Sequence, residues 1–217
     1  GDGNDYLDGG GDDDQLNGGA GTNVLLGGAG DDRITSVGVG DEIDGGTGLD
    51  WLTLDRRALS EGQVFTMDAA VGFSLTDGTS VSSIERLEAY AGGSGDDEFA
   101  VVVVDGLGSH ALDGNGGADH GIADFRALTA DITTSSGSSS GGLLNGGRRS
   151  FLESGGADHV TFYDFERFTV FSGSGNDQLT TSAGDDYLYG GAGDDNLQGG
   201  DGNDYLDGGG DDDQLNG

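Results

Sequence analysis

The chain has 217 residues, of which 48 are glycine, 41 are acidic and eight are arginine, with no lysine, proline or cysteine, and its formal net charge is −33 at pH 7. The absence of cysteine excludes disulfide bonds and thiolate metal sites. Such an excess of negative charge repels nucleic acid and destabilises any compact state that lacks neutralising cations. No run of apolar residues is long enough to span a bilayer, so we expect no transmembrane segment.

The first 18 residues, GDGNDYLDGGGDDDQLNG, recur without change as residues 200–217. Self-similarity of this kind is typical of repeat architectures. The offset between the copies predicts one period of a tandem array followed by an overlap of two nine-residue rows, and it makes neighbouring copies of the same unit the expected end-to-end partners. That the identical ends only reflect how the chain was cut is an open alternative.

Rows of nine residues fill residues 1–53 and 172–217. A typical row begins with two glycines, carries an aspartate at its sixth position and ends in a short apolar segment, as in GGAGDDRIT from Gly27. An isolated row, GGSGDDEFA, starts at Gly92, and the row SVGVGDEID from Ser36 is degenerate. The rows resemble the calcium-binding nonapeptide of RTX proteins, G-G-x-G-x-D-x-U-x with U a large apolar residue. The resemblance covers about half of the chain.

This resemblance implies an all-β fold, a right-handed parallel β-roll of 18-residue coils, interrupted by two β-rich inserts. Within each row, glycine permits the positive φ of a tight turn, and the aspartate supplies the hard oxygen ligand that calcium prefers. The last three positions form a strand whose apolar residue points inward. These inward positions are Leu7, Leu16, Leu25, Ile34, Ile43 and Leu52.

The resemblance also implies that calcium ions, about 7–10 in all, lie between turns one coil apart. The expected pairs are Asp5 with Asn23, Asp14 with Asp32, Asp32 with Asp50, Asp177 with Asp195, Asp186 with Asp204, and Asp195 with Asp213. The full set of expected metal ligands is Asp5, Asp14, Asn23, Asp32, Asp41, Asp50, Asp97, Asp119, Asp177, Asp186, Asp195, Asp204 and Asp213.

Three departures from the pattern affect these sites. Asn23 keeps an oxygen but loses the charge, so we expect weaker sites there. In the degenerate row of Asp41, a structural turn without metal is an equally open alternative. Asp12 and Asp211 replace a turn glycine.

Because one apolar residue per row makes a thin core, we expect the chain to be disordered without calcium and folded with it.

The rows predict five segments: roll rows at 1–53, a first β insert with a hairpin at 54–91, short roll rows at 92–118, a second β insert at 119–171, and roll rows at 172–217. Gly72–Val81 alternates around an Asp-Gly turn and predicts the hairpin, whereas Ser135–Gly142 is predicted to be a Ser/Gly loop. Both inserts leave through a Glu-Arg pair, Glu85-Arg86 and Glu166-Arg167, which we expect to tie each insert back to the roll.

Most aromatic residues lie in the inserts, where they either supply the core that the roll lacks or line a binding groove; we favour the core. No nucleophile elbow, phosphate loop or H-E-x-x-H motif is present, so we expect no enzyme activity. His120 and His159 share the local sequence Gly-Gly-Ala-Asp-His, which duplication of a module explains better than a zinc site.

RTX repeats occur in bacterial toxins, secreted enzymes and giant adhesins that are exported by type I secretion. The resemblance therefore implies a calcium-dependent structural unit of a large extracellular or cell-surface bacterial protein, such as an adhesin extender, a fibre or a surface-layer component. Two alternatives are a calcium-dependent module that binds polysaccharide or a cell surface, and an accessory module of a secreted enzyme or toxin.

Overall fold

The computed structural model describes residues 1–217 except 69–71, 105–107, 140–145 and 155–157. The described residues form strands and no helix, and none of them forms a helix that could cross a membrane. The strands are β1 (Tyr6–Gly11), β2 (Gln15–Asn17), β3 (Val24–Ala29), β4 (Arg33–Ser36), β5 (Glu42–Thr47), β6 (Trp51–Asp55), β7 (Val64–Met67), β8 (Phe73–Ser74), β9 (Ser80–Ser82), β10 (Arg86–Ala91), β11 (Glu98–Val102), β12 (Ser109–Asp113), β13 (His120–Asp124), β14 (Ile132–Ser139), β15 (Gly146–Glu153), β16 (His159–Tyr163), β17 (Arg167–Phe171), β18 (Gln178–Thr180), β19 (Tyr187–Ala192), β20 (Asn196–Gln198), β21 (Tyr205–Gly210) and β22 (Gln214–Asn216).

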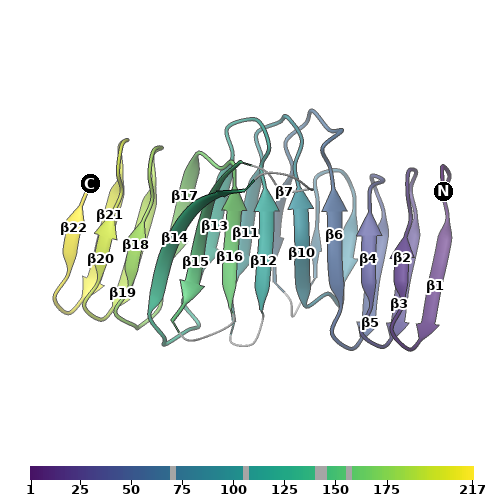
Figure 1. The fold of residues 1–217 in the computed structure, drawn as a ribbon, viewed down its shortest axis with the longest axis horizontal. Helices are drawn as coiled ribbons and strands as arrows, with labels where there is room; N and C mark the ends of the chain where they lie inside the picture. Colours follow the sequence, from purple (N-terminus) through teal and green to yellow (C-terminus); the bar gives the residue numbers. More distant parts are fainter. Residues whose placement is uncertain (69–71, 105–107, 140–145, 155–157) are drawn as a thin grey trace.

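The strands wind into a parallel β-roll, which confirms the predicted fold class. An 11-stranded sheet, β2-β4-β6-β10-β12-β16-β15-β14-β18-β20-β22, forms one wall. A five-stranded sheet, β1-β3-β5-β9-β8, and a six-stranded sheet, β21-β19-β17-β13-β11-β7, complete the roll. In the regular part each residue pairs with the residue 18 positions later, for example Leu7 with Leu25 and Leu16 with Ile34. Figure 1 shows the coils side by side, with the two termini at opposite ends.

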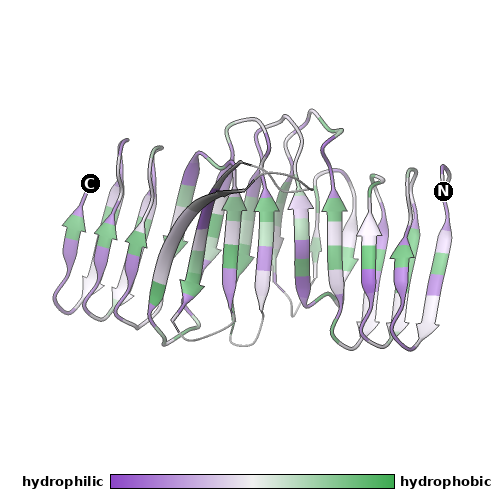
Figure 2. Ribbon diagram, in the orientation of Figure 1, coloured by the Kyte–Doolittle hydropathy of each residue, from purple (hydrophilic) through white to green (hydrophobic). Residues whose placement is uncertain are grey.

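The core is the row of apolar side chains that point into the roll. Leu25, Ile34, Ile43 and Leu52 are at most 1% exposed, and Leu7 packs against them at the N-terminal end. Figure 2 shows these apolar positions as bands across the middle of successive strands. The predicted inward positions are therefore confirmed, and burial of one such residue per row joins all coils into one hydrophobic cluster.

The first insert continues the roll rather than leaving it. Strands β8 and β9 form an antiparallel pair, with Phe73 opposite Val81, which is the hairpin expected around the Asp-Gly turn. Strand β9 stacks in parallel on β5, while β7 begins the six-stranded sheet by pairing with β11. The insert thus supplies the end of one small sheet and the start of the other.

The second insert places an antiparallel hairpin, β14 and β15, inside the 11-stranded sheet between β16 and β18. Residues 135–139, predicted as a loop from their serines and glycines, belong to strand β14 because β15 pairs with them along its length. The other residues of that predicted loop, 140–142, lie outside the described ranges. The register between β14 and β18 pairs Thr133 with Gln178, and beyond this point β14 diverges from the roll (Figure 1).

Aromatic side chains fill the wider middle of the roll. Phe65 lies between Phe73 and Phe99, with ring centroids 5.0 and 4.6 Å away. Phe151 and Phe162 make edge-to-face contacts with each other and with Phe168 on β17, and all three belong to the same hydrophobic cluster. The insert aromatics therefore serve mainly as core, as predicted, and they compensate for the thin core of the regular rows.

Candidate metal sites

Most regular rows begin with a turn whose second and fourth positions are in the left-handed region. Gly28 and Gly30 have φ values of 110° and 133°. Asp12 and Asp211 replace the glycine at the fourth position of their rows, and they keep this conformation with φ values of 73° and 75°. Aspartate is among the few residues that adopt it at modest cost. Both departures from the nonapeptide pattern thus preserve the turn.

The aspartates at the sixth position form ladders along the two edges of the roll. The backbone N–H of one donates to the Oδ1 atom of the next, one coil further on, at 2.8 Å from Asp14 to Asp32 and 2.8 Å from Asp32 to Asp50. The structure brings together all six pairs expected to share an ion, which are 5 with 23, 14 with 32, 32 with 50, 177 with 195, 186 with 204, and 195 with 213.

A second ladder runs in the opposite direction through the fifth position of the rows. Here the N–H of the later coil donates back, from Asp31 to Asp13 Oδ1 and from Leu49 to Asp31 Oδ1, both at 2.9 Å. Sequence reasoning missed this role, although an Asn or Asp directly before the sixth-position aspartate in most rows was the available signal. Each turn is therefore held by hydrogen bonds to both neighbouring turns.

In most sixth-position aspartates the second carboxylate oxygen is buried and has no hydrogen-bond partner among the described residues. A buried carboxylate oxygen without a hydrogen bond is energetically costly, and a cation or a proton removes the cost. The Oδ2 atoms that are buried and without a hydrogen-bond partner in the described structure are those of Asp14, Asp32, Asp50, Asp97, Asp119, Asp177, Asp186, Asp195 and Asp204.

These oxygens face a small space lined by backbone atoms of the turns, which we call the cradle. A Cβ atom placed on Gly9 would lie 2.6 Å from Asp14 Oδ2 and 2.6 Å from the carbonyl oxygen of Gly27 in the next coil. Two acceptor oxygens therefore converge on a space that glycine leaves free. Among the described residues no three His, Cys, Asp or Glu side chains are grouped around a metal position, so backbone carbonyls have to supply the remaining ligands. Such an all-oxygen set fits a hard cation such as calcium.

Burial raises the pKa of these carboxyl groups. Desolvation, with smaller contributions from neighbouring carboxylates, raises the pKa of Asp97 to about 7 and those of Asp119 and Asp195 to about 6. Burial also raises the pKa of Asp50 and Asp177. The folded chain thus disfavours its own negative charge at these positions, which is the electrostatic condition for cation binding.

A family model described as RTX calcium-binding nonapeptide repeat (4 copies) matches residues 1–34, 169–197 and 189–217. These are the segments that carry the regular turns and ladders. In these segments the chain carries RTX calcium-binding nonapeptide repeats. Its repeats bind calcium, which agrees with the oxygen cradles. No curated protein matches the chain.

The RTX ladders extend further than the recognised rows. Glu85 Oε2 accepts the N–H of Asp50 at 2.9 Å, and Glu166 Oε2 accepts the N–H of Asp119 at 2.7 Å. The Glu-Arg exit of each insert is therefore a degenerate row with glutamate at the sixth position, followed at the proper spacing by buried Leu87 or Phe168. This contact is how the inserts are tied back to the roll, and the spacing was the sequence signal for it.

The row of Asp41 has a different geometry. Its Oδ2 accepts a hydrogen bond from the Ser36 hydroxyl at 2.6 Å, and the Arg56 guanidinium donates to that same hydroxyl at 3.0 Å. Arg56 is 1% exposed and also pairs with Asp77 at 2.6 Å. The Ser36 hydroxyl thus occupies the Oδ2 atom that faces the cradle in other rows, which favours the alternative of a structural turn without metal.

The row of Asn23 also lacks the free oxygen. Asn23 Oδ1 accepts the N–H of Asp5, so the amide nitrogen faces the cradle, where a Cβ on Gly18 would lie 2.8 Å from it. An amide NH₂ group donates hydrogen bonds and cannot ligate a cation. Calcium is therefore expected on the ladder of Asp14, Asp32 and Asp50, and not at Asn23.

Two substitutions test this assignment in opposite directions. Asp32→Asn replaces a cradle oxygen with an NH₂ group, so we expect the calcium stoichiometry to fall by about one or two ions. Asn23→Asp adds a cradle oxygen and should raise the stoichiometry by about one ion. Isothermal titration calorimetry measures both. Equal stoichiometry in the two variants and the parent chain would contradict the assignment.

The raised pKa values predict how folding depends on pH. Lower pH should favour folding in the absence of calcium and oppose calcium-induced folding. A carboxyl group whose pKa rises on folding stabilises the fold below its unfolded pKa of about 3.9 and loses that contribution as the pH rises through 6 to 7. In chelator, β structure should therefore increase as the pH falls from about 8 to 5. Because calcium competes with protons, the calcium needed for folding should decrease from pH 5 to pH 8.

Circular dichroism at several pH values, with chelator and with calcium, measures both trends. A metal-free chain whose β content stays constant between pH 5 and 8 would show that the buried carboxylates do not control folding.

Proposed function

We propose that the chain is a structural repeat unit of a large extracellular bacterial RTX protein, an adhesin extender, fibre or surface-layer component, which folds when it meets calcium. The observation that carries the proposal is the set of buried, unpartnered Oδ2 atoms stacked along the roll. These atoms make the closed roll unfavourable without cations. The proposal assigns the chain no catalytic role.

Calcium, when bound, supplies positive charge and oxygen coordination between successive turns. The chain's own residues hold the turns in place for it. Each Oδ1 atom aligns its turn by accepting an N–H from the preceding coil, and the glycines keep the space beside Oδ2 open. Because the formal net charge is −33, folding and ion binding are coupled: the ordered carboxylates repel one another until they are neutralised.

This coupling supports export in an unfolded state. A chain that stays unfolded in the low calcium of a cell and folds in the millimolar calcium outside suits passage through a type I secretion channel. No cysteine has to be oxidised and no prolyl bond has to isomerise during folding.

The repeated ends support tandem continuation of the roll. Strands β21 and β22 stack on β19 and β20 with the same 18-residue register that β1 and β2 make with β3 and β4. If residues 200–217 serve as residues 1–18 of a following copy, Asp213 donates its N–H to Asp32 of that copy. Leu215, now 50% exposed, would become buried. The same two edges also suit end-to-end association between separate chains.

A two-copy chain, in which residues 200–217 of the first copy are residues 1–18 of the second, tests the proposal against the single unit. Far-ultraviolet circular dichroism and sedimentation velocity follow both during a titration from chelator to 10 mM calcium. We expect a coil-to-β transition in both, at lower calcium in the two-copy chain because the joint adds ladder contacts. An unchanged midpoint would contradict tandem continuation, and a chain that is folded in chelator would contradict calcium-triggered folding.

A further inference from the structure

Two neighbouring arginines on β15, Arg148 and Arg149, form no ion pair among the described residues, although the chain carries 41 acidic residues. Neither Arg148 nor Arg149 forms an ion pair or a side-chain hydrogen bond with another residue in the described part of the chain. The other arginines with assigned contacts are Arg56 with Asp77, Arg57 with Asp55, Arg126 with Asp124, and Arg33 and Arg86 over the ring of Trp51.

Arg149 lies on the core-facing side of its strand. It is opposite Phe162 in the sheet, and it shares the face of buried Phe151, two residues along β15. In regular rows this face carries leucine or isoleucine. Burial lowers the pKa of the Arg149 guanidinium, with the charge of Asp186 opposing the effect, and the Nε atom of Arg148 is buried without a partner. A desolvated guanidinium of this kind favours an anion that can pair with it.

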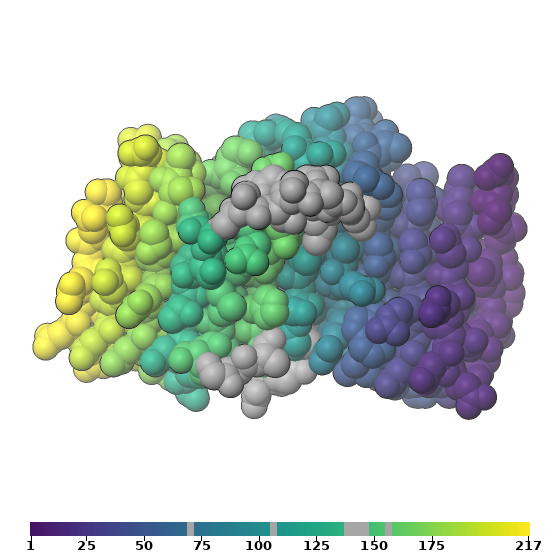
Figure 3. Space-filling view, viewed as in Figure 1, coloured from purple at the N-terminus to yellow at the C-terminus, as the bar shows by residue number. Residues whose placement is uncertain are grey.

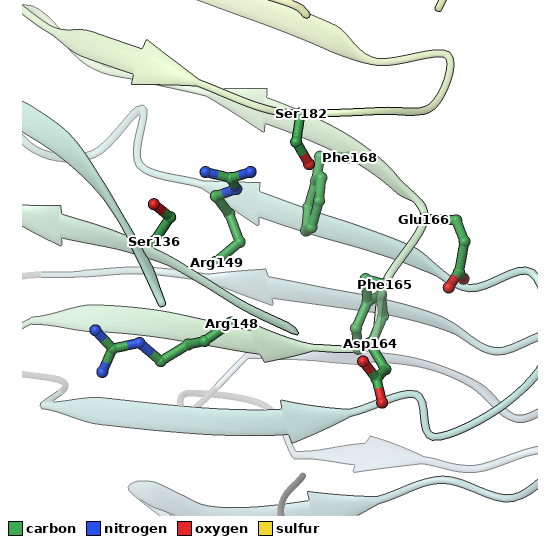
Figure 4. Close-up of a pocket in the computed structure, with 8 residues that line it drawn as sticks. All are labelled: Ser136, Arg148, Arg149, Asp164, Phe165, Glu166, Phe168 and Ser182. Carbon is green, nitrogen blue, oxygen red and sulfur yellow. The ribbon is translucent and has the colours of Figure 1, made fainter. Parts of the chain in front are cut away.

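A cavity of about 390 Å³ opens beside Arg149. It exists because β14 diverges from β18 after Thr133, which parts the sheet on one side of the roll. Figure 4 shows the guanidinium of Arg149 near Ser182 and Phe168, with Ser136 beyond it and Phe165 and Glu166 toward the opposite end. The volume is at the lower end of the range for small-molecule sites, roughly 300–1,000 Å³.

The two ends of the cavity have different chemistry. At one end, Arg149 and the hydroxyls of Ser136 and Ser182 suit a carboxylate or sulfate group. At the other end, the lining includes Asp164 and the exposed Glu166, whose negative charges repel a second anion. Glu166 Oε2 holds the N–H of Asp119, and its Oε1 atom can accept a hydrogen bond from a hydroxyl group. The partly buried ring of Phe165 offers an apolar surface between them. A ligand that fits both ends carries one anionic group, several hydroxyls and an apolar face.

We propose that this cavity binds a single acidic sugar residue, whose carboxylate or sulfate pairs with Arg149 while its hydroxyls donate to Glu166. Arg148 adds positive charge nearby. A bare inorganic anion would contact only the arginine end of the cavity. A densely charged polymer would be repelled by the acidic surface. A sugar with one acidic group is therefore the ligand class that contacts both ends.

Calorimetry in excess calcium, with the folded chain, compares galacturonate with galactose, its neutral counterpart, and with inorganic sulfate. We expect galacturonate to bind at least roughly tenfold more tightly than either, since a charged hydrogen-bonded pair and the hydroxyl contacts add. Equal binding of galacturonate and galactose would overturn the proposal. Sulfate binding as tightly as the sugar acid would reduce the site to an anion site and overturn the sugar assignment.

Three variants assign the contacts. Arg149→Gln should lower galacturonate affinity by roughly tenfold or more and leave the calcium-induced circular dichroism spectrum unchanged, because it removes the charged group that pairs with the ligand while Arg149 makes no ion pair within the described fold. Arg57→Gln, which removes an exposed arginine paired with Asp55, should leave affinity unchanged. Phe165→Leu should weaken the sugar but not sulfate. Unchanged affinity in Arg149→Gln, or an equal loss in Arg57→Gln, would contradict the site.

Discussion

The roll depends on one repeated interaction, the hydrogen bond from a backbone N–H to the Oδ1 atom of the aspartate one coil further on. In the ladder of Asp14, Asp32 and Asp50 it fixes the spacing of the coils, and in doing so it buries the Oδ2 atom of the same carboxylate without a partner. The interaction that aligns the turns therefore also creates their need for a cation. Fold and calcium binding are consequences of the same geometry.

The exits of both inserts obey the same rule, which explains why the roll resumes after each insert. Glu85 and Glu166 continue the ladders with a longer side chain. In the row of Asp41, the Ser36 hydroxyl occupies Oδ2 and is itself held by Arg56. The middle of the roll thus combines calcium-type turns, an internal cation and a large aromatic core. We interpret it as the segment whose stability depends least on calcium, flanked by regular coils that depend on it most.

The regular rows could be predicted from the sequence because their period is strict: Asp32 and Ile34 in one row determine the turn, the strand and the inward side chain. The other features could not be predicted, because they depend on contacts between segments that are far apart in the sequence. The serine-rich start of the second hairpin forms a strand because β15 supplies hydrogen-bond partners, and the orientation of the Asn23 amide follows from which atom accepts the N–H of Asp5. Likewise, nothing in the sequence around Arg149 indicates that it faces the core, since this follows from the register of a hairpin whose strands are inserted out of chain order.

A crystal structure of the calcium-bound chain, with anomalous scattering to identify the ions, is the direct test of the coupling between the ladders and calcium. We predict calcium between successive coils, each ion bound by the Oδ2 atom of a sixth-position aspartate and by the carbonyl oxygen of a glycine such as Gly27, with none beside Asn23 or Asp41. Calcium bound instead to the exposed fifth-position carboxylates, with the Oδ2 atoms still unliganded, would contradict it.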